Sequence, residues 1–353
     1  IQRLAAVLGA RPQELIEAAL GPDAETVRNR PYVEQLRLAI AGHPAPDHII
    51  TRVADGPSCD LESLRQRTLH IWERVHASAY RDMGPAIAAL ISELEHASRT
   101  AAKTQRPQLL SLLAQTYQAA AAMLVKVGDH GAGWVAADRA ISAAERSHDP
   151  ALILAGQLRM ARTLLDSSEK ALGRHVLTQA TRRHDTIIAG RDPGLISLVG
   201  SSALLLAVLY ARDANSADAY QCITVARRLA GALGANHNYY DTEFGPTNVS
   251  MHTMAVAVEL GNGQQALDHA AHVRHADQLA AERQARYLID VARAHVLTRS
   301  SRDAMLALVK AEQIAPEELA ELPRVAALLD DIEAMSKRTR VPGLRELRRR
   351  LYD

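Results

Sequence analysis

The sequence predicts an all-α fold in which successive pairs of helices stack into a solenoid. Hydrophobic residues make up 48% of the 353 residues but aromatic residues only 3%, so the core must consist mainly of Leu, Ala, Val and Ile. Ala and Leu favour helices, and patterns typical of strands are nearly absent. Pro107, Pro150 and Pro193 are spaced 43 residues apart, and each is followed two positions later by Leu. A fixed spacing of this size is typical of stacked repeats.

Two segments precede the predicted array. Residues 1–21 are interpreted as the end of a separate helical domain, and residues 22–59 as a linker that contains a helix, because 42–60 is rich in Pro and Gly. The repeat domain is expected to occupy residues 60–353. Its helix pairs are expected at 60–98, 104–147, 150–184, 193–233, 247–274 and 279–312, with a terminal pair at 317–353. One pair cannot cover its own apolar face, so neighbouring pairs must stack and leave a concave groove.

Local signals place the helix ends. Pro150 and Pro193 fit the first turn of a helix, where the missing N–H of proline costs nothing. Gly128-Asp129 and Gly261-Asn262 follow apolar stretches and are typical of a helix end, because Gly and Asn tolerate the left-handed conformation. A polar segment with several aromatic residues, 232–252, interrupts the array.

The stretch from Leu288 to Pro316 resembles a tetratricopeptide repeat. Small residues at Ala292 and Ala304 would let its two helices approach closely, and His295 stands where the repeat usually has Tyr. The positions that carry the match are Leu288, Val291, Ala292 and His295 on the first helix and Ala304, Leu308, Ala311 and Pro316 on the second. The resemblance implies a right-handed superhelix of such repeats.

The first twenty residues resemble the closing helices of an Xre-type helix-turn-helix domain. Leu4-Ala5, Leu8-Gly9 and Glu14-Leu15 carry this match. Residues 239–270 and 283–319 look like the tetratricopeptide region of Xre-family bacterial transcriptional regulators, in which a DNA-binding head precedes a helical-repeat body.

This resemblance implies the sensor and dimerisation body of a DNA-binding regulator. A peptide or small-molecule effector would bind in the concave groove of a homodimer, and the helices that read DNA would lie upstream of Ile1. The alternative is an adaptor without a DNA-binding head that holds a peptide of a partner protein. A helix-turn-helix encoded upstream of Ile1 would favour the regulator.

Composition limits the partners of this chain itself. The net charge of +1 gives no footprint for nucleic acid or an anionic membrane, and no apolar run is expected to span a bilayer. Cys59 and Cys222 lie far apart without a CxxC pattern, which favours reduced, packed thiols. We expect a cytoplasmic protein that needs no cofactor.

Four residues are the first candidates for the ligand groove. In the register of the repeat, Asn248, Arg286 and Arg293 face inward, and His252 follows Asn248 by one turn. An Asn amide can hold a peptide backbone and an Arg can hold a carboxylate. Alternatively, Asn248 caps or bridges the preceding loop, and the two arginines pair with Asp290 and Glu282 in solvent. Arg159, Arg162 and Tyr117 are second candidates, although Arg stems often lie on apolar surface with their heads in water.

Other polar clusters favour ordinary structural roles. His269, His272 and His275 cannot all share one helix face, so a surface helix is preferred to a metal site. No motif typical of a catalytic site is present, and the chain is not expected to be an enzyme. Arg345 and the run Arg348 to Arg350 could touch DNA phosphates, but a basic last turn more often complements the helix dipole.

Overall fold

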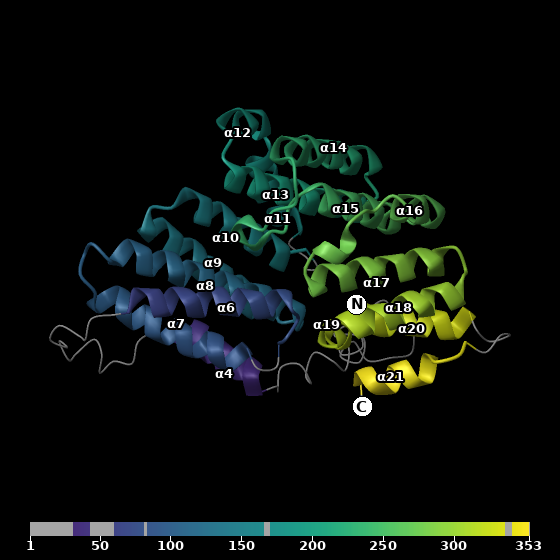
Figure 1. Cartoon of the computed structure of the whole chain (residues 1–353), viewed down its shortest axis with the longest axis horizontal. Coiled ribbons are helices and arrows are strands. Elements are labelled where there is room, and N and C mark those ends of the chain that lie inside the picture. The colour runs from purple at the N-terminus through teal and green to yellow at the C-terminus, as the bar shows by residue number, and fades with distance from the viewer. Residues whose placement is uncertain (1–30, 43–59, 81–82, 166–169, 336–340, 353) are drawn as a thin grey trace, which may run out of the picture.

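The computed structural model describes residues 31–42, 60–80, 83–165, 170–335 and 341–352 (Figure 1). Within these ranges the chain forms seventeen α-helices and no strand, which confirms the all-α prediction. The predicted segment 1–21 and most of the predicted linker lie outside the described residues. The helix that is described there, α4 (Pro31–Ala41), packs against α7 and α9 through Val33, Leu36 and Ile40 and belongs to the helical body.

Most helices form consecutive pairs that pack against each other, with the most extensive contacts in α8/α9, α13/α14 and α17/α18. The pairs are α6 (Leu61–His76) with α7 (Met83–Thr100), α8 (Arg106–Lys126) with α9 (His130–Ser147), α10 (Pro150–Thr163) with α11 (Lys170–Thr181), α13 (Pro193–Arg212) with α14 (Ser216–Leu233), α15 (Pro246–Glu259) with α16 (Gly263–Ala270), and α17 (Ala281–Leu297) with α18 (Ser301–Ile314). A short helix, α12 (His184–Gly190), follows α11. The expected terminal pair is instead three helices, α19 (Pro316–Glu321), α20 (Pro323–Met335) and α21 (Leu344–Tyr352).

The three repeated prolines each lie in the first turn of a helix that begins a pair, namely α8, α10 and α13. The residue before two of them completes the cap. The carboxylate of Asp149 accepts hydrogen bonds from the backbone N–H groups of Ala151 and Leu152, and that of Asp192 accepts one from Leu195. An Asp-Pro start therefore satisfies orphan N–H groups and presets the backbone at the same point.

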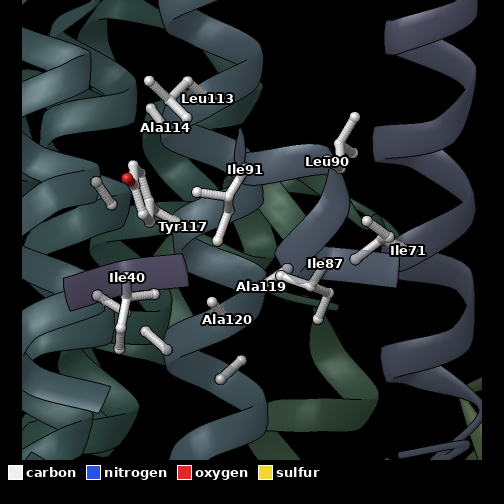
Figure 2. Packing of buried hydrophobic residues seen from close by; sticks show 14 of the residues in the cluster. Ile40, Ile71, Ile87, Leu90, Ile91, Leu113, Ala114, Tyr117, Ala119 and Ala120 are labelled. Atoms are coloured by element: carbon white, nitrogen blue, oxygen red, sulfur yellow. The ribbon is translucent and has the colours of Figure 1, made fainter. Parts of the chain in front are cut away.

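The buried core consists of hydrophobic clusters that follow one another along the chain. The largest contains residues of α4, α6, α7, α8 and α9, among them Ile40, Ile71, Ile87 and Tyr117 (Figure 2). In α8 the run Ala119 to Ala122 is buried, which lets neighbouring helices approach this helix closely. The C-terminal cluster lies between α17, α18, α19, α20 and α21.

The polar segment that interrupts the array is anchored by Phe244. Its ring packs on Gly200 of α13 so closely that a Cβ atom at Gly200 would lie 2.1 Å from the ring. His237 and Phe244 form an isolated antiparallel bridge that closes the segment into a loop. The end of the loop from Thr242 to Gly245 is buried, whereas His237, Asn238 and Tyr239 are exposed.

One helix corrects the sequence-based expectation about apolar runs. By length and composition alone, α13 could cross a membrane, and it is the one such helix among the described residues. However, 78% of its apolar window is buried inside the protein, where α13 packs against α10, α11, α14 and α15. Its high hydropathy is explained by its central position in the core.

The chain curves back on itself, so that its two ends meet. In Figure 1 the N-terminal helices α6 to α8 and the C-terminal helices α17 to α20 lie on opposite sides, with α13 to α16 above them. Helix α17 contacts α6, and the backbone N–H of Tyr80 donates to Glu317 at 2.8 Å. The concave side is therefore closed by contacts between distant helices and is not the continuous open groove that the sequence suggested.

Candidate functional site

A cavity of about 100 Å³ remains on the concave side, between α10, α13, α15, α17 and the start of α20. Five arginines line it but only two carboxylates, those of Glu259 and Asp290. We call it the arginine cavity and define it by Arg162, Arg212, Arg283, Arg286 and Arg324. A second cavity of about 20 Å³, next to α6 and α8, shares Arg162, Arg283 and Arg286 with it.

Three of these arginines have carboxylate partners. Arg286 donates to Glu318 at 2.6 Å and lies 3.4 Å from Glu282. Although burial opposes the charged form, these two carboxylates raise the pKa of Arg286 above its ordinary value. The Nε atom of Arg212 lies 3.6 Å from Glu259, and that of Arg283 lies 3.4 Å from Glu243.

The other two arginines of the cavity lack such partners. Within the described part of the chain, the guanidinium groups of Arg162 and Arg324 form no hydrogen bond or ion pair. Burial, together with the neighbouring Arg283 and Arg286, lowers the pKa of Arg162 to about 9. Burial also lowers the pKa of Arg324, and the nearby Asp290 opposes that effect. Arg162 is therefore charged at neutral pH, and burial makes the charged form of both groups less favourable than it is in water.

Asn248 and His252, which also line the cavity, carry hydrogen-bond acceptors, whereas the arginines carry only donors. The Nδ1–H of His252 donates to the carbonyl of Asn248 at 3.0 Å, because a carbonyl can only accept. Burial and the positive charge of Arg283 lower the pKa of His252 to about 3, so the ring is neutral and Nε2 is an acceptor. The Oδ1 atom of Asn248 is buried and also has no partner among the described residues.

A buried cluster next to the cavities joins the two ends of the fold. We call Tyr80, Lys126, Glu282 and Glu318 the closing cluster. The ammonium group of Lys126 lies 2.7 Å from Glu282 and donates to the Tyr80 hydroxyl at 2.9 Å, and that hydroxyl donates in turn to Glu318. Although burial favours protonation, Lys126 and Arg286 hold the pKa of both carboxyl groups below the ordinary value.

Arg159 connects the polar loop to α10. Its guanidinium group lies 4.8 Å from the Trp72 ring centroid and donates to the carbonyl groups of Tyr240 and Asp241 at 3.3 and 3.0 Å. Burial lowers its pKa, and its side chain is not in water as the sequence-based alternative supposed. These contacts give Arg159 a structural role in holding the loop.

The predicted site residues fall into three groups. Asn248, His252, Arg162 and Arg286 line the arginine cavity, and Arg159 lines the smaller one. Arg293 lies behind the wall and pairs with Glu259 and Asp290 at 3.1 and 3.0 Å. Tyr117 lies in the core, where it donates to Glu95, and lines neither cavity.

The alternative interpretations of these residues also describe real contacts. The Asn248 amide does bridge the preceding loop, since its Nδ2 donates to the carbonyl of Glu243 at 3.0 Å. Arg286 and Arg293 do have Glu282 and Asp290 as partners. They form these pairs inside the fold, however, and not in solvent.

Several site residues were missed by the sequence analysis. Arg283 and Arg324 line the arginine cavity, and Lys126 and Glu318 complete the closing cluster. A signal for Arg283 was present, because charged residues recur along one side of α17 at positions 282, 283, 286, 290 and 293. Such a stripe normally marks a face in solvent, which is why it was not interpreted as the wall of a cavity.

Other clusters lie elsewhere. Among the residues that the structure describes, no three His, Cys, Asp or Glu side chains are placed to share a metal ion. Arg348 and Arg350 at the C-terminus pair with Asp330 and Glu312. Burial raises the pKa of the Cys222 thiol to about 12, which makes it an unreactive packed thiol, while Cys59 lies outside the described residues.

Comparisons with protein-family models, with curated proteins and with solved structures found no match.

Proposed function

We propose that this chain is the sensor body of a bacterial DNA-binding transcriptional regulator and binds a small effector in the arginine cavity. The observation that carries the proposal is a cavity enclosed by helices of four different pairs and lined by charged groups without partners, Arg162 and Arg324. Proteins rarely leave buried charges unpaired, and such groups mark candidate ligand sites. The DNA-binding head, the homodimer and the cytoplasmic location are parts of this proposal that rest on the sequence resemblance.

The helix pairs support a tetratricopeptide-like solenoid as the architecture of this body. The pairs follow one another in chain order, and each buries its apolar face against the next. Helices α17 and α18, which carry the clearest repeat pattern, pack on each other through Ala292 and Ala304, which are both fully buried. In this architecture the cavity lies on the concave side, where helical repeats usually bind their ligands.

The size of the cavity favours a small molecule over a peptide as the effector. An extended peptide needs an open groove, whereas here α17 contacts α6 and closes the concave side. A volume of about 100 Å³ suits a molecule of several heavy atoms. The same closure argues against the alternative function, an adaptor that holds a partner protein's peptide.

The position of the cavity suggests how binding would act at a distance. Arg286 lines the arginine cavity and also bonds to Glu318 of the closing cluster. A ligand that draws the Arg286 side chain toward itself would weaken or strengthen the contact between the two ends of the fold. Binding would then shift the population between two curvatures and change the spacing of two DNA-binding heads in a dimer.

The experiment starts from the coding sequence upstream of Ile1. A helix-turn-helix encoded there would allow the longer protein to be purified and its DNA affinity measured by fluorescence anisotropy, with and without a small-molecule extract of the producing cells. We expect the extract to change the DNA affinity of the wild type but not of Arg162→Met. The control is Arg65→Met, which removes an exposed arginine paired with Glu62.

Two results would contradict this proposal, the first for the regulator and the second for the arginine cavity as the effector site. One is a start codon close to Ile1 with no helix-turn-helix, which would favour the adaptor. The other is an extract effect on DNA affinity that is the same in Arg162→Met as in the wild type, because the effector would then bind elsewhere.

A further inference from the structure

The wall of the arginine cavity contains donors without acceptors and acceptors without donors. From this arrangement we infer that the cavity binds a small molecule that carries an oxyanion, either a carboxylate or a phosphate, and also a hydroxyl or amino group that donates a hydrogen bond. The biological role of this binding rests on the proposed function, but the binding itself does not.

Arg162 is the centre of the inferred anion site. Its guanidinium group lines both cavities and has no hydrogen-bond or ion-pair partner in the described part of the chain. A planar guanidinium offers two parallel N–H donors whose geometry matches the two oxygens of a carboxylate or phosphate group. An oxyanion at this point would supply the counter-charge that the protein itself does not provide.

The carboxylates around Arg162 are already engaged by other cations. Glu282 is shared between Lys126 and Arg286, and Glu318 also contacts both of them. Glu259, on the opposite wall, holds Arg293 at 3.1 Å and Arg212 at 3.6 Å. An entering anion therefore meets an excess of positive charge and need not displace a carboxylate of the protein.

The acceptor side of the site comes from α15. With its Nδ1–H donated to the carbonyl of Asn248, the neutral His252 ring presents an unpartnered Nε2 at the cavity wall. The Asn248 Oδ1 atom also has no partner among the described residues, but it is fully buried and is not open to the cavity. The Nε2 atom of His252 only accepts hydrogen bonds, so a simple anion would leave it unsatisfied, whereas a hydroxyl or amino group of the ligand would donate to it.

The remaining walls limit the carbon skeleton. Leu205 and Val208 of α13 and Met251 and Ala255 of α15 form apolar surface around the cavity. A cavity of about 100 Å³ exceeds the roughly 10–15 Å³ that one water requires, but it excludes a peptide. The site fits a short hydroxy acid, a short amino acid or a small phosphate ester.

The test measures binding of sodium salts to the purified chain by isothermal titration calorimetry, at constant ionic strength in chloride. The probes are lactate, propionate, which lacks the hydroxyl group, lactamide, which lacks the charge, and inorganic phosphate. We expect lactate to bind at least tenfold more tightly than propionate, and lactamide to show no binding. The phosphate arm tells whether the anion site prefers a tetrahedral or a planar oxyanion.

Substitutions at Arg162 and His252 test the anion site and the hydrogen-bond acceptor separately. Arg162→Met should reduce lactate affinity at least tenfold, whereas Arg65→Met should leave it unchanged. His252→Phe should abolish the preference for lactate over propionate while the anion still binds. Without any anion, Arg162→Met should melt at a higher temperature than the wild type, because it removes a buried charge without a partner. A loss of fold would not produce that rise.

The inference is overturned if lactamide binds as tightly as lactate, a comparison that needs only the wild type. Equal binding of lactate and propionate would contradict the donor requirement, and unchanged lactate binding by Arg162→Met would contradict the anion site. These binding results can be distinguished from a failure of the proposed function. A neutral effector that controls DNA affinity would contradict the inferred oxyanion site but support the sensor function. Oxyanion binding without any effect on DNA affinity would support the oxyanion site but contradict the sensor function.

Discussion

Individual buried charges in this protein are not matched one to one. Lys126 shares two carboxylates with Arg286, while Arg162 and Arg324 have none within the described ranges. Removing charges from water costs several kcal/mol each, and only good pairing repays that cost. An interior optimised for stability alone would replace such residues with apolar ones. Their presence at one cavity is the residue-scale reason to assign a ligand to it.

The neutral His252 ring makes stability depend on pH. Its pKa is lowered from 6.5 to about 3 in the folded chain, so below pH 6.5 the unfolded chain binds a proton that the folded chain does not. Stability should therefore fall as the pH falls, by up to about 1.4 kcal/mol per pH unit from this group. Urea unfolding of the wild type should show this loss between pH 6.5 and 5, and His252→Gln should show less of it.

The comparison between pH 6.5 and 5 isolates the histidine. The carboxyl groups of Glu282 and Glu318 have pKa values below the ordinary 4.5, so their contribution is lost only at lower pH. Equal slopes of unfolding free energy for the wild type and His252→Gln would show that the ring takes up a proton in the folded state.

A single glycine sets how closely the polar loop can approach α13. At Gly200 a Cβ atom would lie 2.1 Å from the Phe244 ring, so Gly200→Ala should destabilise the fold by about 1–3 kcal/mol through overpacking. Gly231→Ala on α14 is the matched control, because its Cβ would meet nothing within 4 Å. That variant should stabilise the helix by about 0.5–1 kcal/mol. Denaturant midpoints that move alike in both variants would contradict the packing.

At the scale of elements, the paired helices were predictable and the terminal helices were not. Pro150 and Pro193 follow capping aspartates, and this local signal placed the starts of α10 and α13 correctly. The expected terminal pair failed because Pro323 starts a new helix directly after Leu322, and the short helix α19 ends before it. A proline disfavours the helical conformation of the residue before it, so Pro323 was a signal for this break that the sequence analysis did not use.

The candidate site was predictable only where it depends on one element. Asn248 and His252 were found because residues four apart share a helix face, and both line the cavity. Lys126 was missed because its partner Glu282 lies more than 150 positions away in the chain. That contact arises from closure of the whole curve, about which local spacing carries no information. Tyr117 was proposed from its depth in the helix, yet side-chain direction places it in the core.

The Asp-Pro start of α10 has a measurable energetic role. The Asp149 carboxylate accepts hydrogen bonds from two backbone N–H groups, at 3.0 and 3.2 Å. Asp149→Ala should reduce the free energy of unfolding by about 1 kcal/mol. Asp138→Ala, on the exposed side of α9, is the control and should change it little. Equal losses in both variants would mean that the cap does not stabilise the helix that carries Arg162.

At the scale of the whole molecule, the closing cluster holds the two ends of the curve together. Tyr80 and Lys126 come from the N-terminal half, and Glu282 and Glu318 from the C-terminal half. Lys126→Met leaves two buried carboxylates with fewer cations and should cost about 3–5 kcal/mol of folding free energy, as for other broken buried pairs.

The double variant Lys126→Met with Glu282→Gln tests whether the pair acts as a unit. It removes one cation and one carboxylate together, so it should recover part of the stability that Lys126→Met loses. Chemical denaturation of the wild type, both single variants and the double variant measures the coupling. Strictly additive losses would contradict a direct coupling between these two groups.

Two features are central here: the two sides of the chain contact each other, and the arginines of the enclosed cavity bind an oxyanion. A crystal structure grown with selenate, located by its anomalous signal, tests both parts at once. We predict α17 packed against α6 and an anomalous peak inside the cavity that places selenate oxygens within hydrogen-bond distance of the Arg162 guanidinium group. An open groove between these helices, or selenate peaks only at surface arginines, would contradict the account.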